Sequence, residues 1–478
     1  MDIPFDPTLL FIGGRWQAPR ETLPLFNPST GEPLARIARG TAGDVDTAVA
    51  AAQAALDGAW GQLTATERGR ILMKMSALVL AQADVLARLE ALDVGKPLKQ
   101  GRADAVALAR YLEFYGGAAD KVHGETIPFV NGYTALTLRE PHGVTAHIVP
   151  WNYPMQIIGR SVGAALAMGN ACVLKPAEEA CLTAIAFTHI AQQAGLPAGA
   201  LNLVPGLGEE AGAALSAHRG VQHISFTGSV AVGALIQAAA ARNAVPVTLE
   251  LGGKSPQLVF DDADLDAALP FLVNAGIQNA GQTCSAASRI LVQRGVYDSV
   301  AARMAERYRG LRVGPALDDP DVGPVISERQ REIVNGYLAL AQGQGAQVLA
   351  QPALPTGPGY WVPPTLVGGT DGAHRLAQEE IFGPVQVLIP FDDEAQALAI
   401  ANGTDFGLVA GVWTRDGSRA MRCARQLKCG QVFVNNYGAG GGVELPFGGV
   451  KRSGHGREKG FEALYGFSTL KTVAIKHD

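Results

Sequence analysis

The chain has 478 residues, of which 47% are hydrophobic and 17% are charged, and its formal net charge is −5. At roughly 150 residues per domain this length allows about three domains, and the composition is that of a globular protein with a large core. The charges are interspersed and lack the basic face that nucleic acid or an anionic membrane would require. We therefore expect neither as a partner.

No apolar run in the sequence reaches the length of a transmembrane helix, which needs about 18 residues. The N-terminus opens Met1-Asp2-Ile3-Pro4 and lacks the basic start and apolar stretch of a signal peptide. The sequence has 5 cysteines, an odd and sparse number that fits a reducing cytosol rather than a disulfide framework. We therefore predict a cytoplasmic protein.

The first half of the chain predicts helices followed by a hairpin. The segment 42–118 is rich in alanine, and its apolar residues recur at the three-to-four spacing of helices. Asn131-Gly132 then favours a type I′ turn between the strand candidates 126–130 and 135–139.

Short apolar strands and helical stretches alternate after the hairpin, which predicts an α/β fold with parallel sheets built from βαβ units. The strands of the first predicted sheet are 144–149, 171–174, 201–204, 223–226 and 247–251. The strands of the second predicted α/β domain are 290–292, 385–389 and 432–434. The tail 469–475 alternates like one further strand.

Cys284 is the candidate nucleophile. It lies in Gly281-Gln282-Thr283-Cys284-Ser285, among polar and small residues. The other cysteines have no candidate catalytic residues near them in the sequence and are expected to be structural. A loop-to-helix entry would let backbone N–H groups lower the pKa of this thiol. On local sequence alone a structural role is equally open. No Cys or His pair has ligand spacing, so we expect no metal site.

Two further residues could serve the same chemistry. Glu250 ends a strand candidate and precedes two glycines, where partial desolvation would raise its pKa and suit it to act as a base. Asn152, in Pro150-Trp151-Asn152-Tyr153-Pro154, could donate to an oxyanion. A solvated glutamate and a turn asparagine are the alternatives.

Two motifs could hold a nucleotide. Phe226-Thr227-Gly228-Ser229 reads as a strand, a turn and a helix start, whose N–H groups with the Ser229 hydroxyl could bind a pyrophosphate. It lacks the GxGxxG spacing, so an ordinary βα turn is equally open. Lys175 and Glu178 could bind ribose hydroxyls or form a surface ion pair.

Together these motifs resemble the aldehyde dehydrogenase superfamily over nearly the whole chain and in the family's order. The resemblance extends through Glu379-Glu380-Ile381-Phe382-Gly383-Pro384, Pro446-Phe447-Gly448-Gly449-Val450-Lys451-Arg452-Ser453-Gly454 and Gly456-Arg457-Glu458. It implies an NAD(P)-dependent enzyme that oxidises an aldehyde to its carboxylic acid.

The resemblance also implies residue roles. Cys284 would attack the aldehyde as thiolate, while the Asn152 amide and the Cys284 backbone N–H hold the oxyanion. Glu250 would activate the water that hydrolyses the thioester, and Glu458 would assist Glu250.

The implied cofactor residues come from several motifs. Lys175 and Glu178 would bind the adenosine ribose, and Trp151 and Ser229 the pyrophosphate. Glu380 would bind the nicotinamide ribose beside Phe382, and Gly228 would let the backbone approach closely. Because Glu178 would repel a 2′-phosphate, we expect NAD to be preferred over NADP.

The family's architecture implies three parts. These are a Rossmann-like cofactor domain (1–122 and 142–252), a catalytic α/β domain (253–455) and a β oligomerisation arm (123–141 and 466–478). An exposed strand edge is removed when it joins a neighbour's sheet, so we expect a homodimer or homotetramer.

The substrate is less determined by the motifs. The resemblance places Tyr153, Arg160 and Phe447 in the substrate tunnel. An arginine at the position of Arg160 binds the substrate carboxylate in succinic semialdehyde dehydrogenases and occurs in some lactaldehyde and aromatic aldehyde dehydrogenases. The succinic type has a second arginine where this chain has Gln278. We therefore expect a semialdehyde or another polar or aromatic aldehyde, and the glycine-rich stretch 438–442 would leave a roomy or mobile tunnel mouth.

Three alternatives stand beside these predictions. Arg160 could be paired elsewhere on a helix surface. A CoA-acylating aldehyde dehydrogenase would share the cysteine and the cofactor site, but that branch generally lacks the water-activating glutamate, so Glu250 counts against it. A non-catalytic structural homologue would not need Cys284, Glu250 and Asn152 together.

Overall fold

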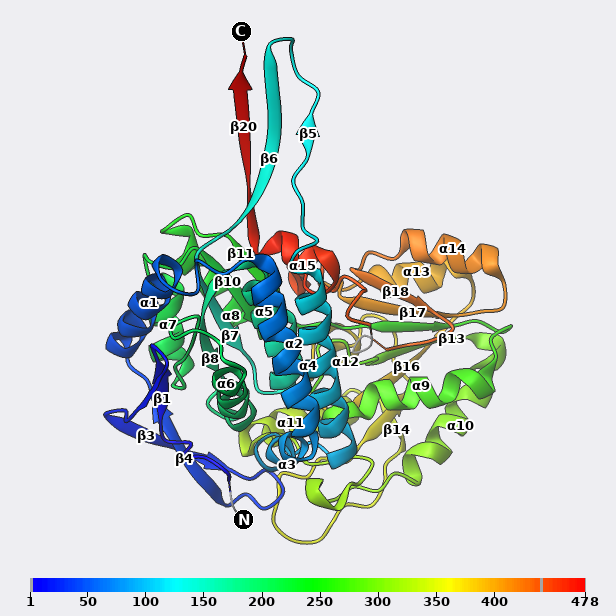
Figure 1. Ribbon diagram of the computed structural model, residues 1–478. Helices are drawn as coiled ribbons and strands as arrows, with labels where there is room; N and C mark the ends of the chain where they lie inside the picture. Colours follow the sequence, from blue (N-terminus) through cyan, green and yellow to red (C-terminus); the bar gives the residue numbers. More distant parts are fainter. Residues whose placement is uncertain (1–2, 439–441, 478) are drawn as a thin grey trace.

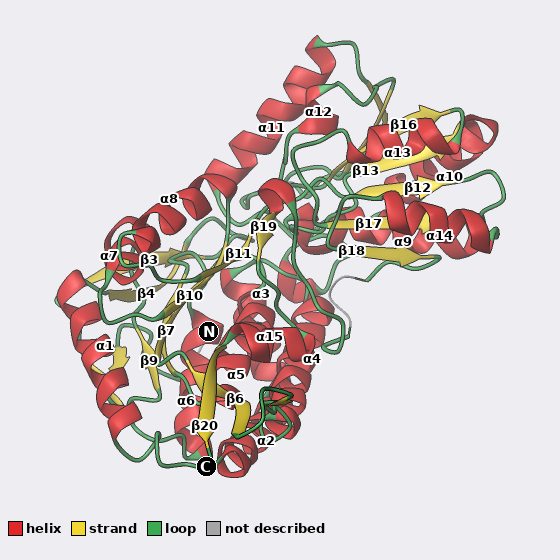
Figure 2. Cartoon of the chain, turned by 90° about the horizontal axis from the view of Figure 1, so that it is seen from above, coloured by secondary structure: helices red, strands yellow, loops and turns green. Residues whose placement is uncertain are grey.

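A computed structural model of the chain describes residues 3–438 and 442–477. Two mostly parallel sheets, each flanked by helices, form the body of the molecule, and a three-stranded arm projects from it (Figure 1). Seen from above, the two sheets lie in adjoining halves of the body (Figure 2). In the part of the chain that the structure describes, no helix combines the length and apolar character needed to cross a bilayer.

The helical prediction for 42–118 is confirmed. The segment forms α1 (Ala42–Asp57), α2 (Ala65–Ala81), α3 (Ala83–Asp93) and α4 (Leu98–Ala118). Capping boxes begin two of them: the Thr41 hydroxyl accepts from the Asp44 N–H, and the Thr64 hydroxyl accepts from the Glu67 N–H. Each acidic side chain bonds back to the cap, which satisfies backbone donors that the helix leaves unpaired.

The first sheet contains the predicted parallel strands, in the order β19-β11-β10-β7-β8-β9-β1-β2. The parallel members are β7 (Val144–Val149), β8 (Ala171–Pro176), β9 (Leu201–Leu203), β10 (His223–Thr227) and β11 (Val247–Glu250). Antiparallel pairings extend the sheet at both ends: β1 (Leu10–Ile12) pairs with β9 and with the edge strand β2 (Arg15–Gln17), and the other edge strand, β19 (Gly454–His455), pairs with β11. The strand order reverses between β7 and β10, and ligands of doubly wound sheets bind beyond the carboxyl ends of strands at such a point.

Helices follow the parallel strands of this sheet. They are α5 (Pro154–Met168), α6 (Leu182–Ala194), a π-helical turn (Gly208–Gly212) leading into α7 (Ala213–Ala217), and α8 (Val230–Ala241). The buried core around them draws mainly on the first half of the chain and also takes in four residues from its end, Val443, Ala463, Leu464 and Phe467. A small hairpin of β3 (Glu21–Phe26) and β4 (Pro33–Arg39) lies outside this sheet.

The second sheet has the order β14-β15-β16-β13-β12-β17-β18. Its strands are β12 (Pro256–Val259), β13 (Arg289–Gln293), β14 (Gln347–Ala350), β15 (Thr365–Gly368), β16 (Val385–Phe391), β17 (Val409–Trp413) and β18 (Gln431–Val434). Its helices are α9 (Leu265–Ile277), α10 (Tyr297–Arg309), α11 (Glu328–Gly343), α12 (Arg375–Gln378), α13 (Glu394–Asn402) and α14 (Gly417–Gln426). The predictions of strands at 290–292, 385–389 and 432–434 are confirmed.

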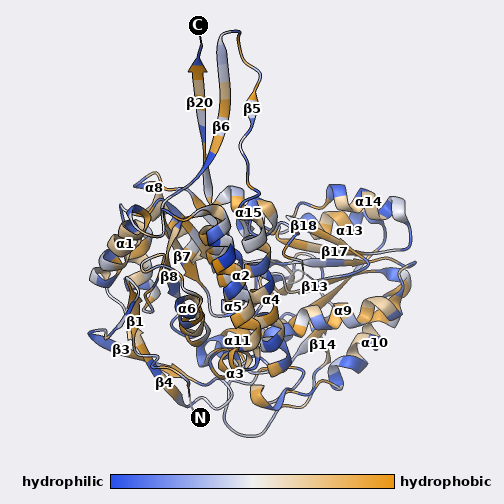
Figure 3. Ribbon diagram, in the orientation of Figure 1, coloured by the Kyte–Doolittle hydropathy of each residue, from blue (hydrophilic) through white to orange (hydrophobic). Residues whose placement is uncertain are grey.

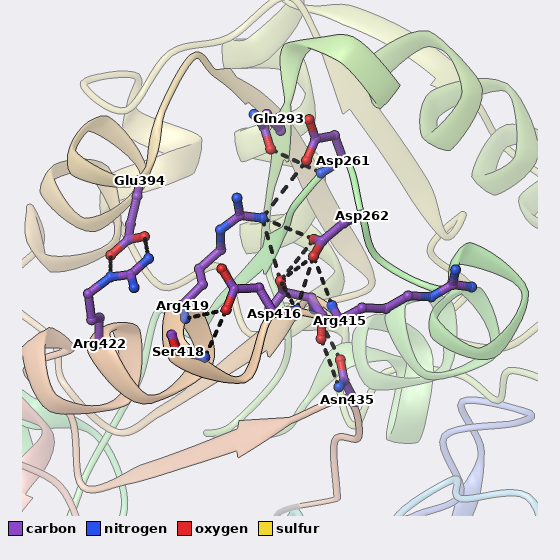
Figure 4. Close-up of polar contacts among 11 residues, drawn as sticks. Asp261, Asp262, Gln293, Glu394, Arg415, Asp416, Ser418, Arg419, Arg422 and Asn435 are labelled. Carbon is purple, nitrogen blue, oxygen red and sulfur yellow. Dashed lines mark hydrogen bonds and ion pairs between the residues drawn. The ribbon is translucent and has the colours of Figure 1, made fainter.

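A polar network ties one edge of this sheet together (Figure 4). The Asp262 carboxylate accepts hydrogen bonds from the Thr414 hydroxyl at 2.8 Å, from the Arg415 N–H at 3.1 Å and from an Arg419 Nη1 at 3.0 Å. Asn435 bonds to both backbone groups of Thr414. The network thereby holds the loop after β17 against the chain that leaves β18.

The arm consists of β5 (Thr126–Ile127), β6 (Tyr133–Pro141) and β20 (Ser468–Lys476), with α15 (Gly460–Gly466) at its base. The predicted hairpin and tail strand are confirmed. The prediction of a type I′ turn is wrong, because that turn needs a positive φ at both central residues, and of Asn131 and Gly132 only Gly132 has one, 81°. Pro128 cannot donate to the ladder, so β5 ends early and a longer loop forms. Hydrophobic residues recur along the projecting strands (Figure 3), and Leu470 is 56% exposed.

Candidate active site

Two cavities meet at Cys284. One, about 280 Å³, lies among α4, α5 and α9 and is called here the helix-lined cavity. The other, about 340 Å³, lies beyond the carboxyl ends of β7 and β10 and is called the strand-end cavity. Asn152, Thr227 and Cys284 line both. A molecule in each cavity could therefore reach the same thiol.

The loop before Cys284 has a strained backbone. Asn279 and Ala280 have φ of 50° and 52°, and Gly281 follows with 70°. A Cβ on Gly281 would lie 2.2 Å from the Gly383 carbonyl oxygen, so only glycine fits there. Left-handed non-glycine residues persist where the surrounding structure holds them, and they gather at active sites. Here the buried side chain of Gln282 holds the loop, since it accepts from the Ile326 N–H at 2.9 Å.

Asn152 is buried beside this loop. Its side-chain amide donates to the Gln282 carbonyl at 3.0 Å, and its backbone carbonyl accepts from the Asn279 amide at 2.9 Å. An asparagine amide has two hydrogens, so the second can be directed at an oxygen in the cavity that Asn152 lines.

Glu250 ends β11 and is buried, at 1% exposure. Within the described ranges neither of its carboxylate oxygens has a hydrogen-bond partner, although the side chain lines the strand-end cavity together with Cys284. Burial raises the pKa of Glu250 well above its ordinary value, and the neighbouring Glu458 raises it further. A carboxyl in this state suits proton transfer near neutral pH.

Cys284 is half-buried. Burial raises the pKa of its thiol to about 12, Arg160 opposes that effect, and Glu250 adds to it. The thiol therefore needs a proton acceptor to become a nucleophile. Glu250 shares a cavity with it and is a buried carboxylate without a hydrogen-bond partner among the described residues.

The strand-end cavity brings together several of the predicted cofactor residues. Trp151, Gly228, Ser229, Glu380 and Phe382 line it. Ser229 caps α8, accepting from the Val232 N–H at 3.3 Å, so the helix N-terminus opens toward this cavity, as suits a phosphate group. The rings of Trp151 and Phe382 meet edge to face at 5.3 Å.

Glu380 is fixed by a backbone contact. It accepts from the Gly253 N–H at 2.9 Å, and a Cβ on Gly252 would lie 2.0 Å from its carboxylate. Glycine at 252 is thus required for this carboxylate to lie where it does. Burial raises the pKa of Glu380 to about 7.

Lys175 and Glu178 lie next to the strand-end cavity. They form an ion pair at 3.0 Å in which the lysine is 3% and the glutamate 32% exposed. Glu178 lines a further cavity of about 250 Å³. That cavity shares Glu179, Ile326 and Ser327 with the strand-end cavity, so the two form one elongated site.

The wall of the helix-lined cavity mixes polar and apolar side chains. The predicted residues Tyr153, Arg160 and Phe447 lie in it, as does Gln278. Residues 439–441 of the glycine-rich stretch lie outside the described residues, and Gly438 lines the cavity.

Sequence reasoning missed other members of this wall. Gln156 and Ile157 follow Tyr153 at helical spacing on α5, and Asn274 precedes Gln278 by four residues. The three-and-four spacing of these side chains is a signal that could have found them. Thr227, at the junction of the cavities, carried no such signal beyond its place at the end of a strand.

Arg160 is buried rather than on a helix surface. Its guanidinium forms an ion pair with Glu458 and lies 4.9 Å from the centre of the Phe447 ring. Glu458 also accepts from the Ser225 hydroxyl at 3.1 Å. Among described residues, Nη2 of Arg160 has no hydrogen-bond partner.

A sequence model of the aldehyde dehydrogenase family matches residues 16–473. The chain belongs to the aldehyde dehydrogenase family. An aldehyde dehydrogenase from Emericella nidulans is 42% identical over 472 residues, covering 98% of this chain and 95% of the relative.

Solved structures agree with the family. A protein from Burkholderia cenocepacia is 62% identical, with a TM-score of 0.97, over 98% of this chain and 100% of that chain. The NAD⁺ complex of an aldehyde dehydrogenase from Bacillus cereus is 37% identical, with a TM-score of 0.96, over 98% of this chain and 97% of that chain. Membership in the aldehyde dehydrogenase family makes the protein an oxidoreductase that acts on aldehydes.

Proposed function

We propose that this aldehyde dehydrogenase oxidises its substrate to the carboxylic acid with NAD, through a covalent intermediate on Cys284. The observation that carries the proposal is the meeting of the two cavities at Cys284, Asn152 and Thr227. The helix-lined cavity can admit an aldehyde to one side of the thiol. The strand-end cavity lies at the position where doubly wound folds bind dinucleotides.

The residues support a sequence of steps. Glu250 accepts the thiol proton, Cys284 Sγ adds to the aldehyde carbon, and the second N–H of the Asn152 amide donates a hydrogen bond to the resulting oxyanion. When bound, NAD supplies a hydride acceptor. Loss of hydride from the thiohemiacetal carbon restores its C=O bond and leaves a thioester. Once the proton taken from the thiol has passed from Glu250 to solvent, Glu250 takes a proton from water, whose oxygen adds to the thioester and expels the Cys284 thiolate.

The elongated strand-end site fits NAD. Ser229 and the start of α8 would hold the pyrophosphate beside Trp151, and Glu380 would accept from the nicotinamide ribose beside Phe382. Glu178 and Lys175 would bind the adenosine ribose, and the Glu178 carboxylate would repel a 2′-phosphate. Comparison of kcat/KM for the two cofactors tests this: NAD should be favoured, and a clear preference for NADP would contradict the assignment.

The activity is tested by NADH absorbance over aliphatic, aromatic, ω-amino and semialdehyde substrates, with Cys284→Ala as the inactive control. Undiminished NADH formation by Cys284→Ala would overturn the mechanism. A second assay adds coenzyme A and compares free acid with acyl-CoA as the product. The carboxylate of Glu250 favours hydrolysis of the thioester, so free acid is expected. Formation of acyl-CoA in place of free acid would assign the protein to the CoA-acylating branch.

For the substrate we propose an aldehyde that carries a second polar group, such as a semialdehyde. Support comes from the polar side chains of Gln156 and Asn274 in the wall of the helix-lined cavity and from Nη2 of Arg160, which has no hydrogen-bond partner among the described residues. The guanidinium charge is already balanced by Glu458, so a hydroxyl or carbonyl acceptor fits as well as a carboxylate. Arg160→Lys should raise KM for polar aldehydes relative to plain ones of equal length, and an unchanged ratio would exclude the contact.

A further inference from the structure

The loop between β7 and α5 holds the two residues that precede the nucleophile. The Asn152 amide donates to the Gln282 carbonyl at 3.0 Å. One position further along each segment, the hydroxyls of Tyr153 and Thr283 lie 3.0 Å apart and form a hydrogen bond. Cys284 follows Thr283 directly, so the loss of either contact would let the backbone that carries its Sγ move.

A buried lysine lies against the ring of Tyr153. Lys96, between α3 and α4, is 0% exposed, and its Nζ is 3.8 Å from the centre of that ring. A cation over an aromatic face is attracted by the partial negative charge of the face, and more strongly where water is excluded. The contact therefore fixes the plane of the ring, and with it the direction of the hydroxyl that reaches Thr283.

Two buried carboxyl groups hold the lysine in place. Nζ of Lys96 lies 3.1 Å from Glu90 Oε1, on α3, and also contacts one oxygen of Asp104, on α4. Glu90 is 0% and Asp104 3% exposed. The other oxygen of Asp104 accepts from the Gln156 amide, on α5. Buried charges persist where they are paired and hydrogen-bonded, so three helices together set the position of the ammonium group.

We infer that Lys96 is a positioning residue for the nucleophile: it orients Tyr153, whose hydroxyl holds Thr283 and thereby the direction of Cys284 Sγ. This inference rests on the proposed role of Cys284. Tyr153 lines the helix-lined cavity, whereas Lys96 is not among the described residues that line either cavity at Cys284. Lys96 therefore acts through the tyrosine and not by touching the aldehyde.

The test measures the first turnover of NADH formation by stopped flow, with saturating NAD and propanal, a short aldehyde without a second polar group. This phase contains the attack of Cys284 and the loss of hydride, and it precedes hydrolysis. Tyr153→Phe keeps the ring and removes the hydroxyl, so it should slow this phase by about 10–100-fold, as misplacement of a reacting group does. Tyr111→Phe is the matched control. Its buried hydroxyl has no hydrogen-bond partner among the described residues, and the rate should stay within about twofold of wild type.

The lysine is tested by combining Glu90→Gln, Lys96→Met and Asp104→Asn. This triple variant leaves no unpaired buried charge, so it should fold. It should slow the first turnover by about tenfold or more, yet by less than about twofold when Tyr153→Phe is already present, because the lysine acts through that hydroxyl.

Asp104→Asn alone covers a triple variant that does not fold. It releases the ammonium group from one of its two carboxyl groups and keeps an oxygen for the Gln156 amide. The first turnover should slow by a smaller factor than in the triple variant, and this loss should also disappear when Tyr153→Phe is present.

Equal losses with and without the Tyr153 hydroxyl, or no loss, would overturn the inference while leaving the proposed function intact. None of the varied residues is among the described residues that line the strand-end cavity, so the Kd for NAD should be unchanged. A Kd that weakens in step with the rate would show a general loosening of the fold and would also contradict the positioning role. A wild-type protein without aldehyde-dependent NADH formation would overturn the proposed function, and the inference with it.

Discussion

Asn152 offers a clear test at the scale of one residue, because its two amide hydrogens have different tasks. One donates to the Gln282 carbonyl, and the other is proposed to meet the oxyanion. Asn152→Ala should lower kcat by about 10²–10³-fold, the usual cost of losing one such donor. The backbone carbonyl that holds Asn279 remains in the variant, so circular dichroism should show an intact fold, while loss of the hydrogen bond to the Gln282 carbonyl should lower the free energy of unfolding by about 1–3 kcal/mol. A loss below tenfold would remove Asn152 from the oxyanion site.

Glu380 predicts a pH dependence of cofactor binding. Burial raises its pKa to about 7, so the folded protein holds this group protonated below pH 7 and ionised above it. The ionised carboxylate accepts stronger hydrogen bonds from ribose hydroxyls. The Kd for NAD should therefore fall as pH rises from 6 to 8, by up to about tenfold per unit below the pKa. Glu380→Gln should bind more weakly with a flatter profile, and a wild-type Kd independent of pH would contradict the proposed contact.

The residues of the site differ in how far sequence could predict them. Cys284, Glu250 and Asn152 lie in motifs, and the structure brings all three to the strand-end cavity. The surroundings of Arg160 could not be predicted, since its partner Glu458 is almost 300 positions away in the chain. The positive φ of Ala280 could not be predicted from the sequence either, because alanine ordinarily avoids that conformation and only the fold imposes it.

At the scale of elements, the Asp262 network makes a stability prediction. Its carboxylate accepts from Thr414, Arg415 and Arg419 and is 33% exposed. Hydrogen bonds to charged groups contribute about 1.5–3 kcal/mol each when buried, and partial exposure reduces this. Asp262→Ala should lower the free energy of unfolding by about 1–3 kcal/mol.

The neighbouring Asp261 gives the matched control for that experiment. Its carboxylate is 53% exposed and lies 3.8 Å from Arg419, so Asp261→Ala should change stability by less than about 1 kcal/mol. Urea or thermal unfolding of the two variants side by side makes the comparison. Equal effects would show that the several short contacts of Asp262 are not what holds the loop after β17.

Elements with a visible period were predicted best. The four helices of 42–118 and the edge strand β20 show their patterns directly in the sequence. The buried strands β12 and β17 were missed, because a strand covered on both faces reads as a short apolar run without alternation. The type I′ turn was wrong because local preference at Asn131-Gly132 gave way to the proline that ends β5.

In the whole molecule, the site is assembled from two sheets that different parts of the sequence form. Glu250 and Asn152 come from the first sheet, whereas Cys284 precedes the second strand of the other sheet. The order of motifs could predict a shared site, but the helix-lined cavity arises from packing of α4, α5 and α9. Such packing is a property of the assembled fold. The residues that select the substrate therefore come from several elements, and no single sequence motif contains them.

The arm carries the last prediction, which concerns assembly. Its strand β20 pairs with β6 along its length but leaves Leu470 and Ile475 56% and 49% exposed. Exposed apolar residues on a projecting sheet edge favour pairing with a second copy, and we propose a homodimer or homotetramer. Light scattering at micromolar concentration should give a multiple of 49.8 kDa. Leu470→Asp with Ile475→Asp should lower that mass, whereas Leu354→Asp, at a 39% exposed apolar position on the body, should not. A wild-type monomer would refute the proposal.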